Sequence, residues 1–148
     1  MNDSKSRRGF LSKISFVIMG SIPGLFFSNG CSITGLTTYH YRSNDGEILL
    51  PLSQHPELNI KEGGVQIDVE DSSVSIVVVR LPENNFIALS PICSHLGCTV
   101  RKEGSFFRCP CHGSTYSLTG NVVRGPAEQA LKMYRTEYKN NSVLIYLQ

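Results

Sequence analysis

The chain has 148 residues, of which 41% are hydrophobic and 18% are charged. This length suits one compact domain with a short appendage and excludes two full domains. The formal charge is +2 at pH 7, but four basic residues against one acidic residue place +3 within residues 1–13. The remainder therefore sums to −1. Without a basic excess in the body, nucleic acid is not expected as a partner.

The N-terminal segment has the composition of a targeting sequence. Arg7 and Arg8 precede Phe10 and an uncharged apolar run over 14–27, a pattern that resembles a twin-arginine export signal. This route exports proteins that are already folded. From the paired arginines and the apolar run we expect residues 1–39 to be a twin-arginine signal with a candidate membrane anchor. The expected location is the outer, periplasmic or extracytoplasmic, face of the cytoplasmic membrane.

Three fates of this segment remain open. Fourteen apolar residues are fewer than the roughly 20 that span a bilayer. However, no charge occurs between Lys13 and Arg42, so an uncharged stretch over 14–36 is long enough to stay as an anchor. Cys31, which stands apart from the other four cysteines, is a candidate lipidation site. Cleavage after Gly30 would instead release a soluble protein.

Beyond residue 40 the sequence predicts short strands separated by turns. Apolar and β-branched runs alternate with groups of Gly, Pro, Asn, Asp and Ser. These runs cover 47–52, 65–70, 74–81 and 86–90, followed by a closing hairpin of 131–138 and 143–147. The run 74–79 is the most apolar and is expected to lie deepest. The predicted fold is all-β: an antiparallel sandwich or barrel-like base within residues 40–148, carrying an inserted segment, 91–127.

The inserted segment contains four of the five cysteines in two tight groups. They read Cys93-Ser94-His95-Leu96-Gly97-Cys98 and Cys109-Pro110-Cys111-His112-Gly113-Ser114-Thr115-Tyr116. In each group a Cys and a His lie two or three residues apart, so one tight loop can direct both at a metal centre. A hairpin between the groups would bring the loops together. His40 and His55 have no such partner, and we expect both to be solvated.

The two motifs resemble those of Rieske iron-sulfur proteins, specifically the branch found in cytochrome bc-type, quinol:cytochrome c reductase complexes. The resemblance covers 91–127 and implies the Rieske fold with a [2Fe-2S] cluster. The implied ligands are Cys93 and Cys109 on one iron and His95 and His112 on the other.

The resemblance assigns roles to further residues of the motifs. It implies a disulfide between Cys98 and Cys111, which needs an oxidising compartment and therefore agrees with the export signal. It also implies that Ser114 donates a hydrogen bond to a bridging sulfide and Tyr116 to a ligand cysteine sulfur. Such hydrogen bonds stabilise the reduced, more negative state and raise the reduction potential.

A third segment is implied to cover the cluster and contact the docking partner. It comprises Gly125 and Pro126, with Leu96 from the first motif. Glu128 follows where a second Pro is common in the family, and the thirteen residues between His95 and the second motif are fewer than usual. These departures leave the identity of the docking partner open.

The ligand set favours a high-potential centre. Two Fe(III) and two sulfides carry +2, so two thiolates make the oxidised site neutral, whereas four thiolates would make it −2. A neutral site accepts an electron more easily, which places such clusters in a range of about −150 to +300 mV.

The resemblance implies one-electron transfer by a subunit of an oxidoreductase complex, with no turnover by the chain alone. The expected donor is quinol, with a membrane cytochrome b as partner, and the expected acceptor is a cytochrome. Alternatives are the small subunit of an exported arsenite-oxidase-type molybdenum enzyme, a free-standing Rieske ferredoxin and a structural zinc protein. The pair Cys98 and Cys111 argues against the cytosolic ferredoxins, and Gly113-Ser114-Thr115-Tyr116 argues against zinc.

Overall fold

The computed structural model describes residues 34–148. The predicted targeting segment, with the twin-arginine motif and Cys31, lies outside the described residues. Within residues 34–148 the regular structure consists of strands and short 3-10 helices, and no helix there has the length and apolar character to cross a membrane. The strands are β1 (Thr37–Tyr41), β2 (Glu47–Pro51), β3 (Gly64–Val69), β4 (Ser75–Arg80), β5 (Phe86–Leu89), β6 (Arg101–Glu103), β7 (Phe106–Arg108), β8 (Thr115–Ser117), β9 (Val122–Arg124), β10 (Met133–Lys139) and β11 (Ser142–Tyr146), and the 3-10 helices are η1 (Leu52–Gln54), η2 (Pro56–Asn59) and η3 (Pro82–Asn84).

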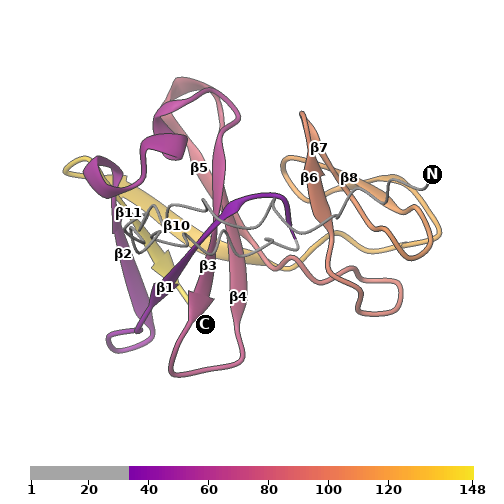
Figure 1. The fold of residues 1–148 in the computed structure, drawn as a ribbon, viewed down its shortest axis with the longest axis horizontal. Helices are drawn as coiled ribbons and strands as arrows, with labels where there is room; N and C mark the ends of the chain where they lie inside the picture. Colours follow the sequence, from indigo (N-terminus) through magenta and orange to yellow (C-terminus); the bar gives the residue numbers. More distant parts are fainter. Residues whose placement is uncertain (1–33) are drawn as a thin grey trace, which may run out of the picture.

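The strands form two sheets. Seven strands, in the order β1-β3-β4-β5-β10-β11-β2, make the base, and β6-β7-β8-β9 make a smaller sheet. Figure 1 shows the smaller sheet as a separate lobe at one end of the base. The chain enters this lobe after β5 and returns to the base through β10, which confirms the predicted insertion. We call residues 91–127 the loop lobe.

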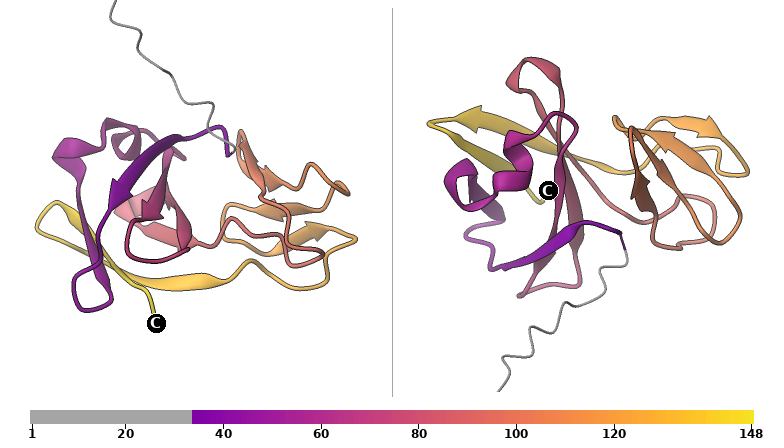
Figure 2. Two further views of the ribbon diagram at one scale, coloured as in Figure 1. Left: turned by 60° about the horizontal axis from the view of Figure 1, so that its bottom comes forward. Right: turned by 45° about the horizontal axis from the view of Figure 1, so that its top comes forward.

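The base curls around a single core, which gives it the barrel-like shape visible in Figure 2. Alternate residues of a strand point to opposite faces, and in this sheet one face of nearly every strand turns toward the same interior. The buried residues of this core include Ile48, Leu50, Val65, Ile67, Ile76, Val78, Ala88, Tyr134, Val143 and Ile145. The all-β, barrel-like prediction is therefore confirmed.

Strands β4 and β5 are buried on both faces and form the wall between base and loop lobe. Val77, Val79 and Leu89 point away from the barrel interior and pack in a second core with Phe107 and Tyr116 of the loop lobe. Burial on both sides explains why this stretch is continuously apolar rather than alternating. The run predicted to lie deepest is at most 1% exposed over 76–79.

Strand β1 was not predicted, and it changes the interpretation of a histidine. β1 crosses the boundary drawn between residues 39 and 40 and pairs in parallel with β3. His55 is 0% exposed, so the expectation that it is solvated is wrong, whereas His40 is exposed as expected. The His55 Nδ1–H donates to the Pro51 carbonyl at 2.8 Å, and its Nε2 accepts from the Tyr41 hydroxyl at 3.1 Å. His55 is therefore a fully hydrogen-bonded core residue that ties β1 to the base.

Candidate metal centre

The two motifs form loops with the same backbone geometry. In the first, the Gly97 N–H donates to the Cys93 carbonyl at 3.0 Å, and in the second, the Gly113 N–H donates to the Cys109 carbonyl at 3.0 Å. The amide of each leading cysteine donates to the carbonyl five residues further on, at 2.8 Å in both loops. Both glycines have a φ of 78°, a region that residues with a Cβ rarely adopt. The glycines therefore close each loop tightly.

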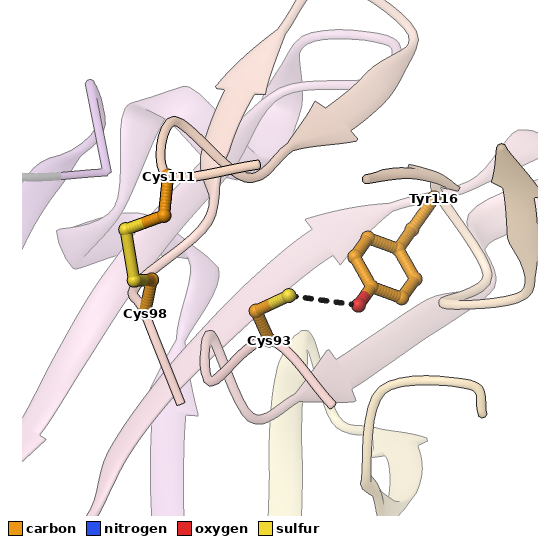
Figure 3. The surroundings of a disulfide bond; sticks show 4 residues. All are labelled: Cys93, Cys98, Cys111 and Tyr116. Atoms are coloured by element: carbon orange, nitrogen blue, oxygen red, sulfur yellow. Dashed lines mark hydrogen bonds between the residues drawn. A yellow bond between two sulfur atoms is a disulfide. The ribbon is translucent and has the colours of Figure 1, made fainter. Parts of the chain in front are cut away.

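A disulfide joins the loops, as the sequence predicted. Cys98 and Cys111 are bonded with an S–S distance of 2.01 Å and a Cα–Cα distance of 6.5 Å, and Figure 3 shows this bond beside Cys93. The sulfurs of Cys98, Cys109 and Cys111 all lie within 4.8 Å of one another. Since two of these sulfurs are bonded to each other, only the Cys109 thiolate remains to bind a metal.

The four predicted ligands are brought to the same end of the lobe. Cys93 and Cys109 are free thiols that are 2% and 1% exposed. The rings of His95 and His112 lie edge to face with centroids 4.9 Å apart. The His95 Nδ1 is buried without a hydrogen-bond partner, the single such side-chain atom within residues 34–148. A buried polar nitrogen is costly unless it is bonded, so this atom fits a metal ligand, and the residues present fit a two-thiolate, two-imidazole centre.

Tyr116 lies beneath the first loop and stabilises the thiolate of Cys93. Its hydroxyl is 3.1 Å from the Cys93 Sγ, the contact drawn as a dashed line in Figure 3. Burial alone would raise the pKa of the Cys93 thiol, but hydrogen bonds from the Tyr116 hydroxyl and from the His95 and Leu96 amides lower the pKa below its usual value. Burial and the contact with Cys93 raise the pKa of Tyr116. Tyr116 therefore stays protonated and donates to the sulfur.

Ser94 is part of the site, which the sequence did not reveal. Its backbone N–H donates to the Tyr116 oxygen at 3.2 Å, and its hydroxyl oxygen also lies 3.2 Å from that atom, so Ser94 holds the Tyr116 hydroxyl beside Cys93. Its hydroxyl donates to the Gln129 carbonyl at 2.5 Å. In the sequence Ser94 is only the residue between Cys93 and His95, and no local signal points to its partner 35 residues away.

Residues 125–129, which we call the third loop, pack against the second motif. Ser114 is fully buried, and its hydroxyl accepts a hydrogen bond from the Ala127 N–H at 3.0 Å. The Gly125–Pro126 peptide bond, in the segment predicted to cover the cluster, is cis. Leu96 is 67% exposed at the tip of the first loop. A cavity of about 310 Å³ lies between the first and third loops, lined by Ser94, His95, Pro126, Glu128 and Gln129.

The fold and the site together define a small all-β protein that presents a metal centre on two disulfide-linked loops. Residues 50–135 match the family described as the Rieske [2Fe-2S] domain. This match covers more than half of the chain, so the chain belongs to the Rieske [2Fe-2S] family. Its cofactor is a [2Fe-2S] cluster rather than zinc, and its function is one-electron transfer.

Relatives place the chain near one branch of this family. It is 27% identical to cytochrome b6-f complex iron-sulfur subunit 1 of Trichormus variabilis, over 94% of this chain and 83% of that protein. It is 44% identical to the chloroplastic b6-f iron-sulfur subunit of Bigelowiella natans, but over only 41% of this chain and 25% of that protein. The crystal structure of the plasma membrane Rieske protein PetC3 from Synechocystis PCC 6803 matches with a TM-score of 0.54 and 30% identity, over 62% of this chain and 92% of that one.

The disulfide is expected to contribute substantially to stability. Replacing Cys98 and Cys111 together by Ala removes a crosslink between residues 13 positions apart, which should lower the free energy of unfolding by about 3 kcal/mol. Urea denaturation followed by circular dichroism measures this loss. The matched control is the wild-type chain in dithiothreitol, which should unfold at the same urea concentration as the variant. Equal midpoints for the variant and the oxidised wild type would contradict the prediction.

Proposed function

We propose that Cys93, Cys109, His95 and His112 hold the [2Fe-2S] cluster, with the two cysteines on one iron and the two histidines on the other. The observation that carries this assignment is the buried, unpartnered Nδ1 of His95. Two buried free thiols on the same pair of loops supply the remaining donors. When bound, the cluster supplies a one-electron redox couple at the exposed end of the lobe.

The residues around the ligands support a high potential. The Tyr116 hydroxyl is in position to donate to the Cys93 sulfur. The Ser114 oxygen accepts from Ala127, which leaves the Ser114 proton available to donate to a sulfide of the cluster. Donors to sulfur stabilise the added electron, since the reduced state carries one more negative charge. We infer that both residues hold the potential in the upper part of the range typical of Rieske centres.

We further infer that the chain takes electrons from quinol and delivers them to a cytochrome, beside a membrane cytochrome b. The names of its relatives support this setting, because they are subunits of cytochrome b6-f complexes. The exposure of His112 and of Leu96 also supports it, since a donor can reach the imidazole end of the site directly.

The same proposal includes a location on the outer face of the cytoplasmic membrane. The twin-arginine pattern of residues 1–39 supports export in the folded state. The structural match to a plasma membrane Rieske protein and the oxidised Cys98–Cys111 pair are consistent with it.

The ligand assignment predicts that Cys93→Ser or His112→Ala abolishes cluster binding, because each change removes one of four donors. Iron content and the EPR signal of the dithionite-reduced protein measure the effect. His40→Ala is the matched control, since His40 is an exposed histidine of the base, and it should retain both iron and signal. Full iron and an unchanged spectrum in either ligand variant would show that the assignment is wrong.

The hydrogen-bond proposal predicts that Tyr116→Phe lowers the reduction potential. Loss of a donor worth ~1 kcal/mol in favour of the reduced state corresponds to on the order of 40 mV for one electron. Protein-film voltammetry measures the shift. Tyr134→Phe removes a hydroxyl from another buried tyrosine, which lies in the core of the base, and should leave the potential unchanged. Equal potentials for Tyr116→Phe and the wild type would remove the argument for a high-potential centre.

The quinol proposal predicts the behaviour of membranes from a strain that lacks this chain. The rate of cytochrome reduction by added decylubiquinol should fall to the rate of the uncatalysed reaction. In this proposal the only route from quinol to cytochrome passes through the chain. Complementation with the wild-type gene should restore the rate, and complementation with Cys93→Ser should not. An undiminished rate in the deletion strain would favour the molybdenum-enzyme alternative over the quinol setting.

A further inference from the structure

The outer face of the four-stranded sheet carries a row of arginines at the end where the sheet meets the first, second and third loops of the site. Arg101, the first residue of β6, pairs with Arg108, the last residue of β7. Arg108 pairs with Thr115, the first residue of β8, and Thr115 pairs with Arg124, the last residue of β9. All three arginines are exposed. We call Arg101, Arg108 and Arg124 the arginine row.

The row lies where each strand meets a loop of the site. Arg108 is bonded to Cys109, a proposed ligand, and Arg124 is bonded to Gly125 of the third loop. Arg101 begins the strand that follows the first loop. A molecule that contacts Arg108 therefore touches the chain neighbour of a proposed ligand.

The row is an unfavourable arrangement for the isolated chain. Like charges opposite each other on neighbouring strands repel. One carboxylate, that of Glu103, lies 3.9 Å from Arg108, and both side chains are about half exposed. Among residues 34–148, no carboxylate lies within ion-pair distance of Arg101 or Arg124. Two guanidinium groups are thus available to carboxylates of another molecule.

The charge of the described part of the chain, residues 34–148, is divided along the same line. The loop lobe has four basic residues and one acidic residue, a formal +3. The rest of the described chain, 34–90 and 128–148, has six basic and ten acidic residues, a formal −4. Because the lobe projects from one end of the base (Figure 1), the two charges are separated in space. Such a dipole turns the cluster end toward a negative surface during encounter.

We propose that the arginine row docks an acidic surface of the protein that accepts the electron from the cluster. The inference rests on the proposed function and adds the chemistry of the partner. A protein surface fits better than a lipid headgroup layer, because Phe106 stands two residues from Arg108 on the same face of β7 and is 36% exposed. Exposed aromatic side chains beside arginines are typical of protein interfaces. The planar guanidinium also binds carboxylates through two parallel hydrogen bonds.

The experiment compares the oxidation of the reduced holoprotein by two cytochromes of opposite charge. An acidic c-type cytochrome and a basic cytochrome c are mixed with it in a stopped-flow instrument at low and high salt. The wild type should react faster with the acidic probe, and this advantage should disappear at high ionic strength because exposed charges are screened. The combined variant Arg101→Gln, Arg108→Gln and Arg124→Gln should lose about tenfold in the ratio of the acidic to the basic rate constant. The ratio isolates docking, because a change in potential affects both probes.

Two further variants separate local charge from net charge and from folding. Arg42→Gln, Lys61→Gln and Lys139→Gln remove the same charge from exposed positions of the base, and this control should keep the wild-type ratio. The combined variant Arg101→Lys, Arg108→Lys and Arg124→Lys retains the charge and should keep most of the wild-type ratio of rate constants. An unchanged ratio in the glutamine variant of the row, or an equal loss in the control, would overturn the proposal.

The remaining outcomes distinguish this inference from the proposed function. A wild-type chain without the EPR signal of a reduced cluster would refute the proposed function itself. A normal signal with no preference for the acidic cytochrome would refute docking alone. Vesicles of phosphatidylglycerol and phosphatidylcholine provide the last arm. Wild-type binding to them that is lost in the glutamine variant, without any change in the cytochrome ratio, would assign the row to the membrane and overturn the proposal.

Discussion

The two cluster loops meet at an exposed end of the molecule, where little apolar burial is available to hold them together. Cys111 and His112 are exposed and Cys98 is half-buried, so the covalent bond between Cys98 and Cys111 supplies a constraint that packing at this end does not. The leading cysteines of the loops, by contrast, are anchored in the second core beside β4 and β5. The loops are thus rooted in the interior and linked at the surface. This combination lets a centre be held rigidly while it stays close to any partner that touches the tip.

Hydrogen bonds extend this constraint to the third loop. Ser94 of the first motif reaches the Gln129 carbonyl, and Ser114 of the second motif accepts from the Ala127 amide. Each motif therefore uses one serine hydroxyl to hold the same distant segment. Tyr116 completes the arrangement, because its oxygen is held by Ser94 while its proton faces the Cys93 sulfur. The buried members of this network, Ser114 and Tyr116, are positioned strongly only when every group is satisfied. Loss of the Ser94 or Ser114 hydroxyl would loosen the cover of the site, and loss of the Tyr116 hydroxyl would remove the donor to sulfur.

The parts predicted from sequence are those with local signals. Short apolar runs between turn residues predicted the strands of the base, and the fixed spacing of Cys and His predicted which side chains share a loop. The missed features depend on contacts between distant segments. β1 was not predicted because its half-exposed residues follow no clear alternation, and its parallel pairing with β3 cannot be read from spacing. His55 was expected in solvent because imidazole is polar, yet Pro51 and Tyr41 satisfy both ring nitrogens in the core. The role of Ser94 was missed because its partners, Tyr116 and Gln129, are distant in the sequence.

The arginine row shows most clearly what strand register adds. In the sequence Arg101, Arg108 and Arg124 lie apart from one another, and only the pairing of β6 to β9 brings them into one line. The pairing also gives the row its function in our proposal. In an antiparallel sheet the start of one strand lies beside the end of the next, so the three arginines meet at the end of the sheet that carries the loops. Three exposed charges are screened within about 8 Å at physiological salt. They therefore orient a partner and speed its encounter more than they hold it. A protein that carries one electron at a time needs this balance, because it must release each partner before it meets the next.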